Sequence, residues 1–138
     1  MAQPSMTQPQ VDLALASYER CQRVPEFFRV FYEKFLASDP SIPPMFANTR
    51  FDRQNRLLQH GLGLLLSYAR RPNPSLLERI AARHGPADLN ISEGLYPFFL
   101  ESLIETVRLY DPEFTHAVEH AWRASLAPGV TFMQRFRR

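Results

Sequence analysis

The chain has few glycines, a single cysteine and no long apolar run. Five of its 138 residues are glycine, and Cys21 has no second cysteine with which to form an internal disulfide. Small secreted domains usually depend on disulfides, so this cysteine usage favours a reducing compartment. No stretch has the length and hydrophobicity of a signal segment or of a membrane span. We therefore expect a protein of the cytoplasm that has no membrane contact.

The sequence also lacks the patterns that are typical of nucleic-acid binding. The formal net charge is only +2, and the chain holds no long basic run, no RNA-binding fingerprint and no zinc-finger spacing. The sequence pI of about 9.0 is weak evidence by itself, because it reports on solubility and non-specific association. No nucleic-acid partner is predicted.

Strand-like alternation is missing as well, whereas apolar residues recur at helical spacing. The expected architecture is all-α, with a polar, disordered tail at residues 1–10 followed by one domain at residues 11–138. Phenylalanine is abundant, with 11 residues, and suits a fold that lines an aromatic, water-poor cavity, although large cores also use it. Helices are expected over residues 11–21, 25–37, 49–69, 74–84, 92–110 and 116–136.

Prolines and capping residues mark the ends of these helices. Thr49 and Asp52 have the spacing of a capping box at the start of the long third helix, and Thr115 is expected to cap the last helix. Pro97 leaves the start of the fifth helix open, because the helix either begins near it or is kinked in its first turn. Pro128 is expected to bend the last helix midway.

The long third helix carries a polar residue at the head of an apolar line. Gln54, Leu58 and Leu62 follow one another at i, i+4 and i+8, and a buried amide must find a hydrogen-bond partner. The alternative is that Gln54 lies at the wet edge of the apolar stripe. Gly61 and Gly63 each weaken this helix by about 1 kcal/mol relative to alanine, so a close contact with another helix is expected there.

The fourth helix ends in a histidine on its apolar face. Apolar residues and His84 recur at i, i+3, i+4 and i+7 from Leu77, and Gly85 with Pro86 stops the helix directly afterwards. His84 thus shares the core-facing side of the helix. The imidazole is either a structural histidine, favoured by the helix C-terminus or hydrogen-bonded in the core, or a metal ligand.

In this order and with these gaps, the features resemble a bacterial single-domain globin over roughly residues 11–136. Tyr32 precedes Phe46 by 14 residues, and Gln54 precedes His84 by 30. The resemblance implies a globin fold of about seven to eight helices packed around a haem pocket. It is carried by Phe31-Tyr32, Pro43-Pro44-Met45-Phe46, Gln54 with Leu58, Ile80-Ala81-Ala82-Arg83-His84, residues 91–96, Phe114-Thr115, Val118 and Ala121-Trp122.

The resemblance also implies a cofactor, haem b, and roles for the matching residues. His84 resembles the proximal ligand, which binds the haem iron through Nε2 while Nδ1 donates to the Ile80 carbonyl. Tyr32 and Gln54 resemble the distal polar pair, although a core tyrosine bonded to the backbone is the alternative for Tyr32. Phe46 resembles the phenylalanine that packs against the porphyrin face.

Further cofactor contacts are implied around this set. Leu58 is expected to close the pocket over the bound gas, and Arg83 either reaches a haem propionate or stays exposed. Tyr96 resembles a proximal-side tyrosine of flavohaemoglobin-like globins, but two extra residues separate it from His84. The remaining contacts that the resemblance implies are Leu57 and Leu62.

The function that the resemblance implies is reversible binding of O2, and of CO and NO, at a penta-coordinate haem iron. Tight, slowly released oxygen is useful for scavenging, sensing or transfer. The alternative is a nitric oxide dioxygenase, which would need a separate reductase because the chain has no room for a flavin or nicotinamide domain. Peroxidase-like chemistry and a haem-free interaction module are further alternatives. The chain is expected to be a monomer or a homodimer.

Overall fold

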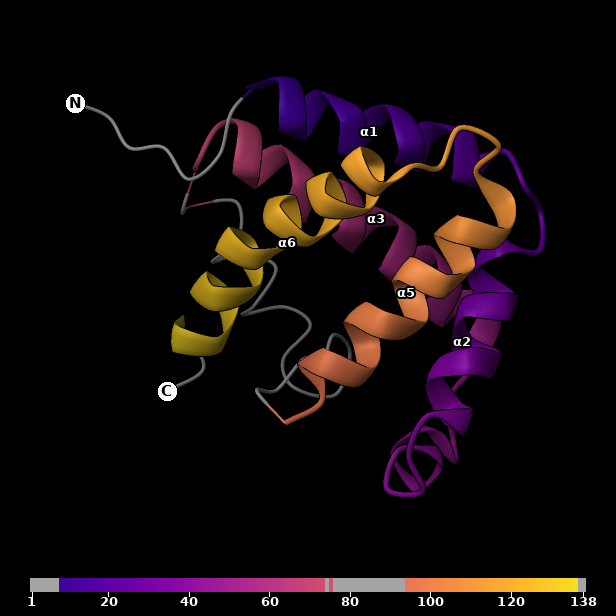
Figure 1. Cartoon of the computed structure of the whole chain (residues 1–138). Coiled ribbons are helices and arrows are strands. Elements are labelled where there is room, and N and C mark those ends of the chain that lie inside the picture. The colour runs from indigo at the N-terminus through magenta and orange to yellow at the C-terminus, as the bar shows by residue number, and fades with distance from the viewer. Residues whose placement is uncertain (1–7, 74, 76–93, 137–138) are drawn as a thin grey trace.

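The structure, a computed structural model, describes residues 8–73, 75 and 94–136. The regular elements in these ranges are helical (Figure 1), which confirms the all-α class. This part of the chain holds five α-helices, against the seven to eight expected for the whole, and the helix expected to carry His84 lies outside it. Within the same ranges no helix combines the length and apolar character that a bilayer span needs. The elements are α1 (Gln8–Gln22), α2 (Phe27–Ala37), the 3₁₀ turn η1 (Pro43–Phe46), α3 (Phe51–Arg70), α5 (Tyr96–Tyr110) and α6 (His116–Phe136).

Helix α1 begins at Gln8, three residues earlier than the sequence predicts. Residues 8–10, which are polar and were expected to belong to the disordered tail, are helical. Val11 and Ala14 on the same helix are fully buried. Adding residues to an existing helix costs less than starting one, so the packed part of α1 supports its polar first turn.

The capping box predicted at Thr49 is wrong. Helix α3 begins at Phe51, with Arg50 as its N-cap and no side-chain hydrogen bond at the cap. The Thr49 amide donates to the Phe46 carbonyl at 3.1 Å, so Thr49 belongs to the turn that follows η1. Asp52 remains in the first turn of α3, where its charge opposes the positive end of the helix dipole.

Two other helix ends agree with the sequence. Thr115 Oγ1 accepts a hydrogen bond from the Val118 amide at 3.2 Å, which confirms the cap of α6. Helix α5 starts at Tyr96 with Pro97 in its first turn, so the first of the two alternatives for this proline is correct. Helix α6 continues through Pro128 without a break.

The helices pack in pairs that fix the positions of α2 and α3. Helix α1 packs against α6 and α3, α3 also packs against α6, and α2 packs against α5 (Figure 1). The contact between α2 and α5 is aromatic, because the rings of Phe31 and Phe35 lie 5.2 Å and 5.9 Å from that of Phe99. Burying each such ring contributes about 1.5–3 kcal/mol. This packing gives α2 a firm support.

A close approach is found at Gly129, where α6 packs on α3. A Cβ atom added to Gly129 would lie 2.6 Å from Leu65 Cδ2. At Gly63, in contrast, a Cβ atom would lie 3.9 Å from Tyr18 Cε2, an ordinary contact distance. The close approach that was expected at Gly63 is therefore not found there, and the crossing of α3 with α6 depends on Gly129.

A buried carboxylate connects α1 with α5 and α6. Asp111, the C-cap of α5, accepts from Arg20 Nε at 2.6 Å and from Arg20 Nη2 at 2.9 Å. Ser17 Oγ donates to Asp111 Oδ2 at 2.6 Å and accepts from Trp122 Nε1 at 2.9 Å. Burial raises the pKa of Asp111, but the hydrogen bonds from Arg20 and Ser17 outweigh burial and hold the pKa below the ordinary value of 3.8.

Replacing Asp111 with asparagine should destabilise the protein by about 1–3 kcal/mol near neutral pH, because Arg20 then faces an uncharged amide. The folded-state pKa is lowered, so the carboxylate's contribution is complete above the unfolded pKa of about 4 and is lost as the pH falls through the folded pKa. The difference in unfolding free energy between wild type and variant should therefore stay constant from about pH 7 to about pH 5 and shrink as the pH falls below about 4. A constant difference in urea unfolding would contradict this account.

Candidate functional site

A tyrosine of α2 and a glutamine of α3 meet in the interior. Gln54 Nε2 donates to Tyr32 Oη at 3.1 Å. The two residues are only 7% and 5% exposed, so Gln54 lies inside the apolar stripe and not at its wet edge. Because the Tyr32 oxygen is the acceptor in this bond, its own O–H remains a donor for a third group.

Aromatic rings hold Tyr32 in position. Its ring centroid lies 5.3 Å from that of Phe51 in α3 and 6.0 Å from that of Phe46 in η1. Phe46 also lies 6.0 Å from Phe35 and 6.1 Å from Phe51, where the two rings are stacked. Edge-to-face and stacked pairs fix ring orientation as well as burying area. The hydroxyl of Tyr32 is therefore held by contacts from α2, η1 and α3.

Tyr32 is a neutral phenol over the physiological pH range. Burial raises its pKa far above the ordinary value of 10.0, and the hydrogen bond from Gln54 acts in the opposite direction without offsetting it. A neutral phenol donates one hydrogen bond, whereas a phenolate only accepts. The pair thus offers donors and no charge.

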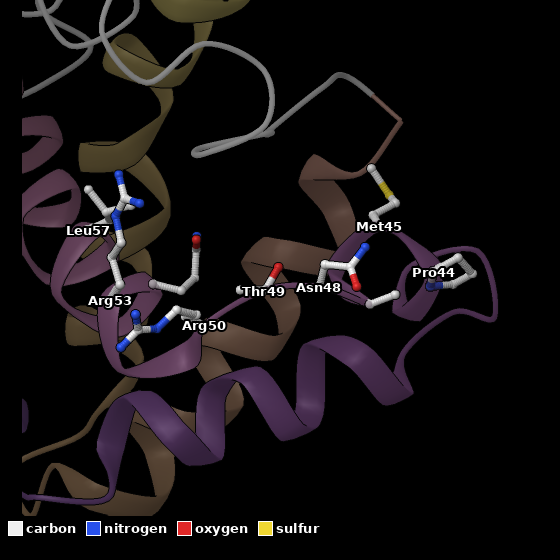
Figure 2. Close-up of a pocket in the computed structure, with 9 residues that line it drawn as sticks. Pro44, Met45, Asn48, Thr49, Arg50, Arg53 and Leu57 are labelled. Atoms are coloured by element: carbon white, nitrogen blue, oxygen red, sulfur yellow. The ribbon is translucent and has the colours of Figure 1, made fainter.

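A cavity of about 420 Å³ opens beside Gln54. Figure 2 shows Arg53 and Leu57 extending from α3 on one side of the cavity, with Asn48 and Met45 on the other. Arginine and amide groups thus flank a space that reaches Gln54. The lining residues are Pro44, Met45, Ala47, Asn48, Thr49, Arg50, Arg53, Gln54 and Leu57.

The structure places the predicted cofactor contacts of α3 at two depths. Gln54 and the half-buried Leu57 line the cavity. Leu58 and Leu62 are 1% and 0% exposed and belong to the hydrophobic core. Phe46, one of the aromatic rings around Tyr32, is partly buried and packs against that core. Of these predicted contacts, the structure therefore places only Gln54 and Leu57 at the cavity wall.

Tyr96 lies at the start of α5 and does not join the polar pair. Its hydroxyl is buried and has no hydrogen-bond partner within the described part of the chain. Burial raises the pKa of Tyr96, with the charge of Arg123 acting in the opposite direction. A proximal-side role for Tyr96 stays a prediction.

Three predicted site residues, Ile80, Arg83 and His84, lie outside the described residues. Ligation by His84 and contacts of the other two with a cofactor therefore stay predictions. Among residues 8–73, 75 and 94–136, no three histidine, cysteine, aspartate or glutamate side chains come together as a group that could hold a metal ion.

Comparison with known proteins decides the family. No protein-family model matches the sequence, and no curated protein matches it. One solved structure has a sequence 34% identical to this chain and superposes on it with a TM-score of 0.84. The match covers 93% of this chain and 98% of the solved chain. That structure is the crystal structure of a Pseudomonas aeruginosa PAO1 protein described as structurally highly homologous to a human hemoglobin. The chain belongs to the globin family.

The sequence alone does not reveal all the residues around the polar pair of this globin. The place of Phe51 beside Tyr32 depends on the contact between α2 and α3, which spacing along one helix does not report. Arg50 and Arg53 line the cavity but resemble an ordinary solvated helix face in the sequence. One signal was available, because cations are disfavoured at a helix N-terminus and an excess of them there is unusual.

Proposed function

We propose that this globin binds haem b in the cavity beside Gln54 and holds oxygen there reversibly. The observation that carries the proposal is the buried hydrogen bond between Tyr32 and Gln54. Buried polar side chains cost free energy, so a neutral polar pair that lies among aromatic rings, with Gln54 at the cavity wall, favours a ligand-binding role. His84 matches the family's proximal position, and we propose that it is the ligand of the haem iron.

The residues around the cavity suit a flat apolar group with carboxylates at its edge. Met45 and Leu57 are among the apolar residues of the lining, and Arg50 and Arg53 supply positive charge at the cavity. When bound, haem b supplies a ferrous iron that binds a diatomic gas. This combination of apolar wall and cationic edge supports haem over a small polar ligand.

Tyr32 would supply the hydrogen bond to the bound gas. Its oxygen accepts from Gln54, which orients the hydroxyl and polarises its O–H bond. A phenol and an amide together contribute about 1–3 kcal/mol, which corresponds to release slowed by up to about a hundredfold. Slow release suits scavenging, sensing or transfer of oxygen better than bulk delivery. CO and NO are the other gases that this site would take.

The cysteine chemistry supports a reducing compartment for this function. Cys21 is buried, and burial raises the pKa of its thiol to about 12. A thiol with such a pKa is protonated and a poor nucleophile, so Cys21 acts as a small core residue. Because the chain has a single cysteine and so no internal disulfide to keep oxidised, we infer a cytoplasmic setting.

The absorption spectrum of the purified protein tests the proposal directly. Titration with ferric haem should give a saturating Soret band at one haem per chain. Reduction followed by CO should then shift that band sharply, as expected for an accessible ferrous site. A protein that stays colourless after reconstitution, while circular dichroism shows it to be folded, would reject the proposed function.

A further inference from the structure

The exposed face of α3 carries arginines that pair weakly or form no salt bridge within the described residues. Within the described residues, most basic side chains pair with a carboxylate, including Arg20, Arg29 and Arg123. Arg53 and Arg56 form no salt bridge within these ranges, although both are exposed. Arg50 lies three residues before Arg53 and pairs only loosely with Asp52, at 3.4 Å. We call Arg50, Arg53 and Arg56 the α3 arginine stripe.

The stripe is placed where a helix least favours cations. Arg50 is the N-cap of α3, and Arg53 and Arg56 follow at intervals of three residues, within the first two turns. The positive end of the helix dipole disfavours the charges of Arg50 and Arg53, which lie within the first turn or at its cap. Asp52 is the only acidic residue in the first turn. An arrangement that costs stability within the chain points to a negative charge supplied from outside.

The stripe runs past the proposed haem cavity. Arg50 and Arg53 line that cavity (Figure 2). Arg56 lies one turn further on, at a separate surface groove that it shares with Gln59 and His60. The positive charge thus extends beyond the cavity, over a helix face, and is larger than a single small ligand in the cavity would need.

We propose that the α3 arginine stripe docks the acidic face of a small one-electron carrier protein that reduces this globin. The proposal depends on the proposed haem function. In the step, one electron leaves the reduced flavin or iron–sulfur centre of the carrier, which is oxidised, and converts ferric to ferrous iron. The stripe steers the carrier by charge to the side where the cavity opens, because complementary charges at a rim mainly raise the association rate.

A protein partner fits the stripe better than nucleic acid or an anionic membrane. Three arginines with Asp52 among them are few beside the six to ten phosphate contacts that DNA-binding proteins typically make. The formal net charge of the whole chain is only +2, which gives little general attraction to polyanions. A carboxylate cluster on a protein surface needs only such a local patch.

Stopped-flow reduction tests the docking. Ferric haem-loaded protein is mixed with photoreduced flavodoxin, an acidic one-electron carrier, at about 20 mM salt and at about 500 mM salt. The double variant Arg53→Glu/Arg56→Glu should react about tenfold or more slowly at low salt, and its difference from wild type should shrink at high salt. Arg71→Glu/Arg135→Glu is the matched control, since it makes the same change of charge at exposed arginines without salt bridges in the described ranges, and it should change the rate less than about twofold.

A second variant separates docking from the cavity. Arg56 does not line the cavity. The variant Arg56→Glu should therefore slow reduction by flavodoxin, and it should leave reduction by dithionite, which needs no docking surface, unchanged. Equal slowing in the stripe and control variants would overturn the docking, and so would stripe-dependent binding of duplex DNA or phosphatidylserine vesicles without binding of flavodoxin. If the protein takes up no haem, the proposed function fails. Fluorescence anisotropy with labelled flavodoxin then still tests the docking. Binding that the stripe variants weaken would support it, and absence of binding would overturn it.

Discussion

Replacing His84 with alanine should leave a folded protein that no longer retains haem. The resemblance to globins assigns the iron to His84, and metal sites weaken by about 10–100-fold even when only a residue that orients a ligand is changed. Removing the ligand itself should therefore cost at least about a hundredfold in haem retention. The measurement is the rate at which haem passes from the protein to an excess of apomyoglobin, followed in the Soret band.

A matched histidine provides the control for this result. His120 is exposed on α6, so His120→Ala should keep the wild-type spectrum and the wild-type rate of haem loss. Added imidazole should partly restore the Soret band of the His84 variant, because it can take the place of the missing ring. Unchanged haem retention in His84→Ala would show that His84 does not bind the iron. It would not bear on the assignment of the globin fold.

The fold could be predicted from the sequence because its signals are local. Helical spacing of apolar residues places Phe31 and Leu58 in the core, where both are almost fully buried. Thr115 caps α6 as its position before an apolar run predicts. The capping box at Thr49 fails for an equally local reason, since the turn after η1 uses the Thr49 amide and shifts the start of α3.

The candidate site could be predicted only in part, because its contacts are not local. The amide at the head of an apolar line predicts that Gln54 must find a partner if it is buried. Its partner, Tyr32, lies 22 residues earlier in the chain, and no periodicity connects the two. Within the described residues Arg53 and Arg56 form no salt bridge, and this too depends on where acidic side chains lie in three dimensions.

Replacing Tyr32 with phenylalanine should speed oxygen release by up to about a hundredfold, which corresponds to a loss of about 1–3 kcal/mol. Gln54 donates to the Tyr32 oxygen, so the hydroxyl is the group that remains to donate to the gas. Gln54→Ala should therefore have a smaller effect, because it only frees the hydroxyl to rotate. Both rates come from stopped-flow displacement of oxygen by CO.

The double variant Tyr32→Phe/Gln54→Ala decides which group is the donor. Loss of the phenol oxygen removes the acceptor of this Gln54 bond, so replacing Gln54 as well has less left to change at the gas. The two substitutions should therefore be non-additive, as expected for residues in direct contact. Tyr18→Phe is the matched control, since it removes a buried hydroxyl that donates to the Gln59 carbonyl, and it should lower stability without changing oxygen release. A larger effect of Gln54→Ala than of Tyr32→Phe would make the amide the main donor and reverse the order of the pair.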